Sequence, residues 1–203
     1  MSTRKQPDAR LQHHTYMTKR AWRRWAKQTR QGLPLAQRSA AVCDVLASSS
    51  LIHTANHILA YLPTPFELDL RSLLEALQHQ GKRIYLTRTW AEHRQLSIHD
   101  VTGLEMDRLE RHPFGYLQPP LDAALVDPKI VGLMLLPGLC FDLAGARLGY
   151  GMGHIDRLLA RTPRAHKVGV VAHELVVNRL PQETTDIRMD ALATDQQILN
   201  CMN

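Results

Sequence analysis

The sequence predicts an α/β fold: a layered, Rossmann-like sandwich with a mainly parallel central sheet. Two observations support this prediction. Apolar runs of strand length alternate along the chain with segments of helical periodicity, which is the pattern of a parallel sheet covered by helices. The strongest apolar run, at 130–136, leads through a turn into a glycine-rich loop and then a helix. Ligands of such sheets bind at the carboxyl ends of the strands, where this loop falls.

The individual elements follow from periodicity and from the residues that end them. Leu73, Leu74 and Leu77 share one face and Gly81 stops the segment, so a helix is expected over 70–80. Further helices are expected over 19–31, 35–48 and 155–160. Strands are expected over 57–62, 83–87, 95–99, 130–136 and 167–172.

The segment 19–31 has the features of a helix with one apolar seam. Thr18 is a suitable N-cap, and Gly32 ends the segment. Trp22, Trp25, Ala26 and Thr29 follow helical spacing, and basic residues surround them: Arg20, Arg23, Arg24, Lys27 and Arg30. For most of these arginines the simplest interpretation is a docking helix with solvated charges.

Length and composition predict one domain over 15–203, preceded by a polar, disordered tail over 1–14. The chain has 203 residues, of which 44% are hydrophobic and 22% charged, as in an ordinary globular protein. No apolar stretch reaches bilayer length and no secretory signal precedes the domain. Three cysteines without C-x-x-C spacing indicate reduced thiols and a cytoplasmic protein, and Cys140 is expected to be a small buried hydrophobe.

The net charge of +6 is concentrated at the N-terminus. Residues 1–30 hold nine Lys and Arg against one Asp, whereas the remaining chain is slightly acidic. The basicity therefore belongs to one segment and is not a broad nucleic-acid footprint. An RNA-binding arm and a site for a small polyanion both explain it, and nucleic acid is the less favoured partner.

The loop at 145–157 reads Gly-Ala-Arg-Leu-Gly-Tyr-Gly-Met-Gly-His-Ile-Asp-Arg. Alternating glycines allow close backbone approach to a ligand, and a helix N-terminus suits an anion. Arg147 and Arg157 flank the loop with guanidinium groups that match phosphate oxygens, and Asp156 is a candidate magnesium ligand. These features predict a phosphate loop. The alternative is a flexible turn in which Asp156 complements the helix dipole.

Two stretches, Pro-Gly-Leu-Cys-Phe-Asp at 137–142 and Gly-x-Arg-Leu-Gly-x-Gly-x-Gly-x-x-Asp-Arg at 145–157, closely resemble a known signature. It is that of the 5-formyltetrahydrofolate cyclo-ligase family, also called methenyltetrahydrofolate synthetases. Less specific markers occur in the family's order: Lys19-x-x-Trp22-Arg23, Tyr61-Leu62-Pro63, Glu67-Leu68-Asp69, Leu180-Pro181, Asp186 and Thr194. The resemblance extends over most of the chain.

This resemblance implies ATP-dependent closure of 5-formyltetrahydrofolate to 5,10-methenyltetrahydrofolate, with release of ADP and phosphate. It implies ATP and Mg²⁺ as cofactors, and a reduced folate and ATP as small-molecule partners of a monomer or weak oligomer. Arg147 and Asp156 are the implied catalytic residues, with Asp156 on the metal. The implied nucleotide-binding residues are Lys19, Arg23, Arg147, Leu148, Gly149, Tyr150, Gly151, Met152, Gly153, His154, Ile155 and Arg157.

Tyr61, Glu67 and Ile155 are the implied substrate-binding residues. Glu67 and Asp69 lie two residues apart, so on an extended segment both would face one side of a pocket. From the residues alone, the alternative is that both are charges at the entrance to the helix over 70–80. The resemblance favours contact between Glu67 and the folate.

Three departures identify a divergent member. The family's tyrosine before the loop aspartate is Ile155, the glutamate of its Gly-Ile-x-Glu-Pro segment is Gln118, and a C-terminal glutamine is Leu175. The nucleotide half of the signature is therefore better preserved than the folate half. A paralogue with another substrate or little activity remains an alternative, and an RNA-binding module using the 19–31 helix is a distant one.

Overall fold

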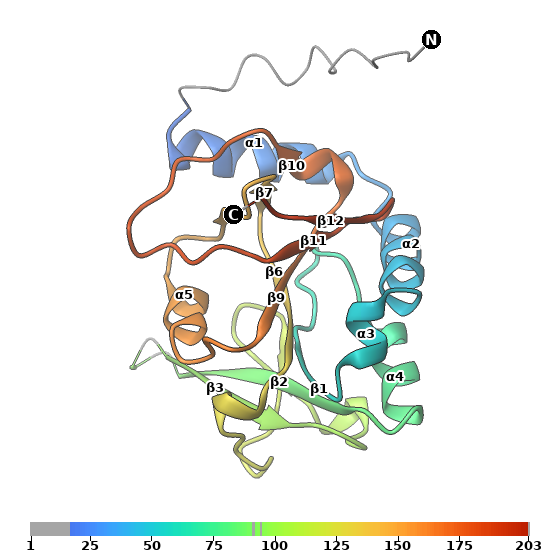
Figure 1. Ribbon diagram of the computed structural model, residues 1–203. Coiled ribbons are helices and arrows are strands. Elements are labelled where there is room, and N and C mark those ends of the chain that lie inside the picture. Colours follow the sequence, from blue (N-terminus) through green and yellow to red (C-terminus); the bar gives the residue numbers. More distant parts are fainter. Residues whose placement is uncertain (1–16, 91, 94, 203) are drawn as a thin grey trace.

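A computed structural model describes residues 17–90, 92–93 and 95–202, so the predicted tail lies outside the described residues. Its centre is a seven-stranded sheet in the order β12-β11-β9-β6-β1-β2-β3, with helices on both faces (Figure 1). The strands of this sheet are β1 (His57–Ala60), β2 (Arg83–Trp90), β3 (Gln95–Asp100), β6 (Leu133–Pro137), β9 (His166–Val170), β11 (Ala191–Ala193) and β12 (Ile198–Asn200). The helices are α1 (Lys19–Gln31), α2 (Leu35–Ala47), α3 (Ser50–Thr54), α4 (Arg71–His79) and α5 (His154–Leu159).

The five inner strands pair in parallel, and the two edge strands are antiparallel. Helix α4 connects β1 to β2, and α5 lies in the connection from β6 to β9. Parallel neighbours need such crossovers, whereas β3 and β12 each follow their partner through a short turn. The predicted mainly parallel α/β sandwich is therefore confirmed.

Side-chain alternation along the strands divides the core into two layers. In β1, Leu59 packs with Trp22 of α1, while Ile58 faces the layer of α2, α3 and α4. In β6, Met134 and Leu136 join the first layer, and the alternate residues join the second. Strands buried on both faces in this way have the continuous apolar runs seen in the sequence.

Most predicted elements are confirmed to within a few residues, but the 130–136 strand was placed too early. A short 3₁₀ helix, η3 (Pro128–Ile130), precedes it because Asp127 accepts a hydrogen bond from the Lys129 amide and caps that turn. Ile130 is consequently exposed, and β6 begins only at Leu133. The 167–172 strand likewise spans His166–Val170. The predicted cap of α1 is confirmed, since the Thr18 hydroxyl accepts from the Ala21 amide.

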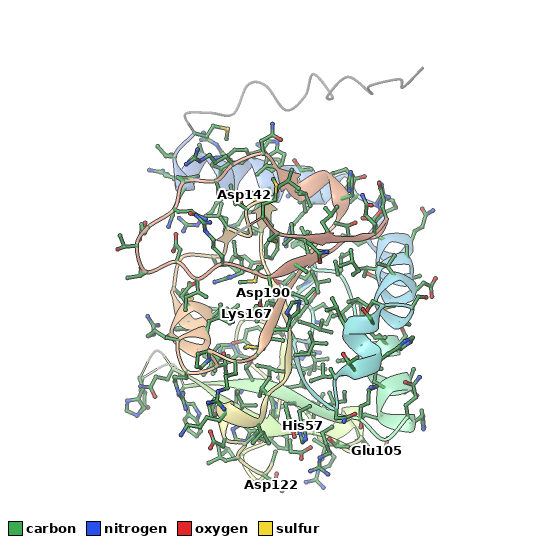
Figure 2. The ribbon with its side chains drawn as sticks, viewed as in Figure 1. His57, Glu105, Asp122, Asp142, Lys167 and Asp190 are labelled. Carbon is green, nitrogen blue, oxygen red and sulfur yellow. The ribbon has the colours of Figure 1, made fainter. Side chains whose placement is uncertain are left out.

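A second sheet directs the chain from the core to the glycine-rich loop. It consists of β7 (Cys140–Asp142), β8 (Arg147–Leu148) and β10 (Val176–Val177). The buried Asp142 carboxylate accepts hydrogen bonds from the amides of Ala144, Ala146 and Leu180, which closes the turn between β7 and β8 (Figure 2). The turn therefore positions Arg147 rigidly. Within the described part of the chain, no helix is both long and apolar enough to cross a membrane.

Candidate active site

A cavity of about 1270 Å³ opens at the carboxyl ends of β1, β2 and β6. Helix α1, the glycine-rich loop, the segment 112–117 and the segment 183–187 contribute its other walls. Every residue that the sequence assigned to nucleotide, substrate or metal lines this one cavity, from Lys19 to Arg157. The fold thus brings together side chains that are up to 138 positions apart in the chain.

The alternating glycines make room for the protein's own guanidinium groups. A Cβ at Gly149 would lie 2.7 Å from Arg147 Nη1, and one at Gly151 would lie 3.1 Å from an Arg23 nitrogen. At Gly153 the nearest atom would be an Arg157 nitrogen, at 3.0 Å. A guanidinium group therefore occupies the space beside each of these glycines. The expectation that they also let the backbone approach a ligand closely stays a prediction.

Arg147 and Asp156 form an ion pair within the cavity wall. Nη2 of Arg147 lies 3.1 and 3.0 Å from the two carboxylate oxygens of Asp156. The Arg147 side chain is only 5% exposed and that of Asp156 is 26% exposed. The predicted phosphate ligand and the predicted magnesium ligand are therefore paired with each other.

The two residues that α1 contributes are held in a similar way. Lys19 Nζ lies 2.7 Å from Asp186 and 3.0 Å from Glu183. Burial lowers the Lys19 pKa, but its hydrogen bonds to these carboxylates outweigh that effect and raise it. Arg23 Nε donates to the Gly149 carbonyl at 2.9 Å, which ties the helix to the glycine-rich loop. Lys19 therefore keeps its positive charge at the cavity.

Helix α5 has only six residues, so its dipole adds little to this site. Gly153, the residue before it, has a φ of 66° in the left-handed region, which favours glycine. The attraction of an anion to this helix N-terminus stays a prediction. The cationic side chains of the cavity lining, Lys19, Arg23, Arg147 and Arg157, all belong to α1 or to the glycine-rich loop over 145–157.

A family model for the 5-formyltetrahydrofolate cyclo-ligase family matches residues 8–195. The chain belongs to this family. It is similar to the 5-formyltetrahydrofolate cyclo-ligase of Escherichia coli K12, with 31% identity over 71% of this chain and 80% of the relative. The solved structure of Aquifex aeolicus 5,10-methenyltetrahydrofolate synthetase has 30% identity and a TM-score of 0.79, covering 92% and 94% of the two chains. The Mycoplasma pneumoniae synthetase, at 18% identity and a TM-score of 0.70, shares the fold.

The two carboxylates expected to share one side of the cyclo-ligase pocket are separated by the structure. Glu67 lines the cavity, and its Oε2 accepts from the Thr64 amide at 2.9 Å. Asp69 lies outside the lining and pairs with Arg71 at the start of α4. The helix-entry interpretation therefore holds for Asp69, whose pKa Arg71 lowers although burial alone would raise it.

Two tyrosines approach the Glu67 side of the cavity. Tyr61 presents its ring, but its hydroxyl donates to the Leu68 carbonyl at 2.8 Å and so serves the fold. Tyr150 is half-exposed, with the Lys27 ammonium 5.8 Å from its ring centroid. Burial raises the Tyr150 pKa, and the Glu67 charge adds to this effect. Tyr150, expected on the nucleotide, thus also borders the predicted substrate carboxylate.

Sequence reasoning missed the hairpin that forms one cavity wall of this family member. Strands β4 (Glu110–Arg111) and β5 (Leu117–Gln118) pair antiparallel, and between them His112, Phe114 and Tyr116 line the cavity. Three ring-bearing residues within five positions, around a Gly-containing turn, were the available signal. Two-residue strands are too short for periodicity to reveal.

The three residues that depart from the family pattern, Gln118, Ile155 and Leu175, lie in different parts of the structure. Ile155 lines the cavity, where the family has a phenol. Gln118 is buried, and its Oε1 accepts from the Thr89 amide at 3.2 Å. Leu175 is 2% exposed and packs in the core beside α1. Only the Ile155 departure therefore removes a polar group directly from the large cavity.

Proposed function

We propose that this chain catalyses the ATP-dependent cyclisation of 5-formyltetrahydrofolate to 5,10-methenyltetrahydrofolate. The observation that carries this proposal is that one large cavity is lined both by the cations of α1 and the glycine-rich loop and by the rings of the β4–β5 hairpin. Ordinary small-molecule pockets measure about 300–1000 Å³, so a cavity of about 1270 Å³ suits two ligands side by side. The nucleotide contacts the cations and the folate contacts the rings.

In the first step, the formyl oxygen of the folate attacks the γ-phosphorus of ATP. A new P–O bond forms, the bond to the β-phosphate oxygen breaks, and ADP leaves. Arg147, Arg157, Arg23 and Lys19 line the cavity where charge spreads over the transferring group, and such positioned cations are the main source of catalysis in phosphoryl transfer. The product is a phosphorylated imidate.

In the second step, N10 of the folate attacks the imidate carbon and loses its proton, while phosphate leaves with the former formyl oxygen. Neither step requires a covalent bond to the protein. Cys140 is accordingly unsuited to be a nucleophile, because it is fully buried outside the cavity lining and burial raises its pKa to about 12. The protein supplies orientation, which makes the encounter of ATP and folate in the first step effectively unimolecular.

Magnesium enters this proposal as part of the nucleotide substrate. Among the described residues, no group of three or more His, Cys, Asp or Glu side chains is arranged to hold a metal ion. Mg²⁺ usually binds through one or two carboxylates together with substrate phosphates and waters. The partly exposed Asp156 suits that role, since phosphate can replace it as the partner of Arg147. The free thiols suit a reducing, cytoplasmic compartment.

The test is formation of methenyl product, followed by its absorbance, with 5-formyltetrahydrofolate, ATP and magnesium. We expect one ADP and one phosphate per methenyl group, and no product when ATP is omitted. Calorimetry with each ligand alone supplies the control. Nucleotide binding without folate binding or turnover would overturn the proposal and favour a paralogue with another substrate, which the departure at Ile155 makes the relevant alternative.

A further inference from the structure

Two residues of the β4–β5 hairpin meet at Thr89 of the sheet. The Tyr116 hydroxyl lies 2.7 Å from Thr89 Oγ1. The Gln118 amide oxygen, where the family has glutamate, accepts from the Thr89 backbone at 3.2 Å. Both side chains therefore fasten the hairpin to β2.

The Tyr116 ring in turn holds His112. The two rings stack with centroids 4.4 Å apart and an interplanar angle of 11°. His112 is 7% exposed, and its Nδ1 accepts a hydrogen bond from the Phe114 amide at 3.2 Å. Because Nδ1 accepts, the neutral ring carries its proton on Nε2. Among the described residues, no hydrogen-bond acceptor pairs with this Nε2–H group. His112 lines the cavity.

The cavity wall formed by the β4–β5 hairpin differs chemically from the wall that carries Lys19, Arg23, Arg147 and Arg157. His112, Phe114, Tyr116 and Leu117 line it without any Lys or Arg. Arg88, which lies close behind, is engaged by Glu110 at 2.6 Å and is not part of the lining. Flat rings, one neutral donor and no formal charge suit a planar heteroaromatic group bearing a carbonyl or carboxylate oxygen.

We propose that His112, stacked on Tyr116, is a specificity-determining residue that donates from Nε2 to an oxygen of the folate while the paired rings face its planar part. This inference rests on the proposed function and assigns the folate to the hairpin wall. Ile155 lines the same cavity without a polar group, so His112 would supply a hydrogen-bond donor that Ile155 lacks. ATP binding at the cationic wall is independent of this inference.

The experiment compares His112→Phe, which keeps a flat ring but removes the donor, with His112→Gln, which restores an N–H group. Calorimetry measures the affinity for 5-formyltetrahydrofolate alone and for ATP alone. We expect His112→Phe to weaken folate binding about tenfold, the worth of one hydrogen bond in a buried site. His112→Gln should recover part of that loss. ATP affinity should change less than about twofold.

His79→Phe is the matched control, because His79 is exposed on α4, away from the cavity lining. Folate affinity of the unchanged protein is measured first, and failure there would overturn the proposed function together with this inference. If the unchanged protein binds folate but His112→Phe binds it equally well, the donor role alone is wrong. Weakened ATP binding with intact folate binding would assign this wall to adenine and likewise overturn the inference.

Discussion

Arg147 and Asp156 form an ion pair in the cavity wall, with Arg147 Nη2 within 3.1 Å of both carboxylate oxygens. The pair keeps a nearly buried guanidinium compensated, since an unpaired buried charge is costly. A triphosphate with its magnesium ion offers each residue a stronger partner, an anion for the arginine and a cation for the aspartate. On the proposed function, we expect MgATP binding to replace this internal pair with one contact from each residue to the ligand.

Replacing Arg147 with alanine should weaken nucleotide binding by about 1–3 kcal/mol, because a charge-assisted hydrogen bond is lost. Arg147→Lys, which keeps the charge but not the planar fork, should fall between the alanine variant and the unchanged protein. Calorimetric titration with an ATP analogue measures both. Unchanged affinity in a folded Arg147→Ala protein would contradict this role.

Replacing Asp156 with asparagine should suppress turnover far more than nucleotide binding, because the metal loses an anionic ligand. It also removes the internal competitor for Arg147, so affinity for metal-free ATP should stay the same or rise. Titrations with and without magnesium, combined with single-turnover rates, separate the two effects. A variant that loses only some thermal stability and keeps full activity would instead support a helix-capping role for Asp156.

Gly149→Ala tests whether the loop glycines exist to admit guanidinium groups. The new Cβ would lie 2.7 Å from Arg147 Nη1 and displace it, so ATP affinity should fall severalfold with little loss of stability. Gly132→Ala is the control, since its Cβ would meet only ordinary contact at 3.7 Å. Equal nucleotide affinity in the two variants would show that Arg147 tolerates the displacement.

Ile155→Tyr restores the phenol that the family carries in the loop. If the missing hydroxyl limits the reaction, kcat/KM for 5-formyltetrahydrofolate should rise while ATP affinity stays nearly unchanged. Steady-state kinetics of methenyl formation provide the measurement. No gain, together with an unchanged protein already as active as the family's other members, would mean that the hairpin wall or another group has replaced the phenol.

Stability should depend on pH through His112. Burial lowers the His112 pKa below its ordinary value of 6.5, and the nearby Arg88 charge lowers it further. Glu110 pairs with Arg88, and the Tyr116 ring faces the imidazole. The unfolded chain therefore takes up this proton first, so the free energy of unfolding should decrease as pH falls below about 6.5 and level off below the folded pKa.

Urea unfolding at pH 7.5 and pH 5.5 measures this decrease. His112→Phe should show a smaller difference between the two pH values than the unchanged protein, because the other histidines are common to both. An identical difference would indicate that His112 titrates normally and that its Nδ1 contact with Phe114 is not maintained.

The glycine-rich loop shows what local sequence could predict about the candidate site and what it could not. Its position after a buried strand and its flanking arginines could be predicted, because β6, β7, β8 and α5 follow one another within residues 133–159. The position of Arg23 beside Gly151 could not be predicted from the sequence, since the two residues are 128 positions apart in the chain. The cavity wall formed by the β4–β5 hairpin could not be predicted for a related reason. Its short strands are held in place by contacts with Arg88 and Thr89 of β2.

By itself, the sequence determined the alternation of helices and strands, the parallel sheet and the family signature, because periodicity, capping and turn residues act within a few positions of the chain. The tertiary structure was needed to show which charges pair with each other, such as Arg147 with Asp156. It was also needed to show that Asp69 pairs with Arg71 at the start of α4 while Glu67 lines the cavity. Those outcomes depend on distances between elements, and each side chain satisfies its charge with whichever partner the fold brings nearest.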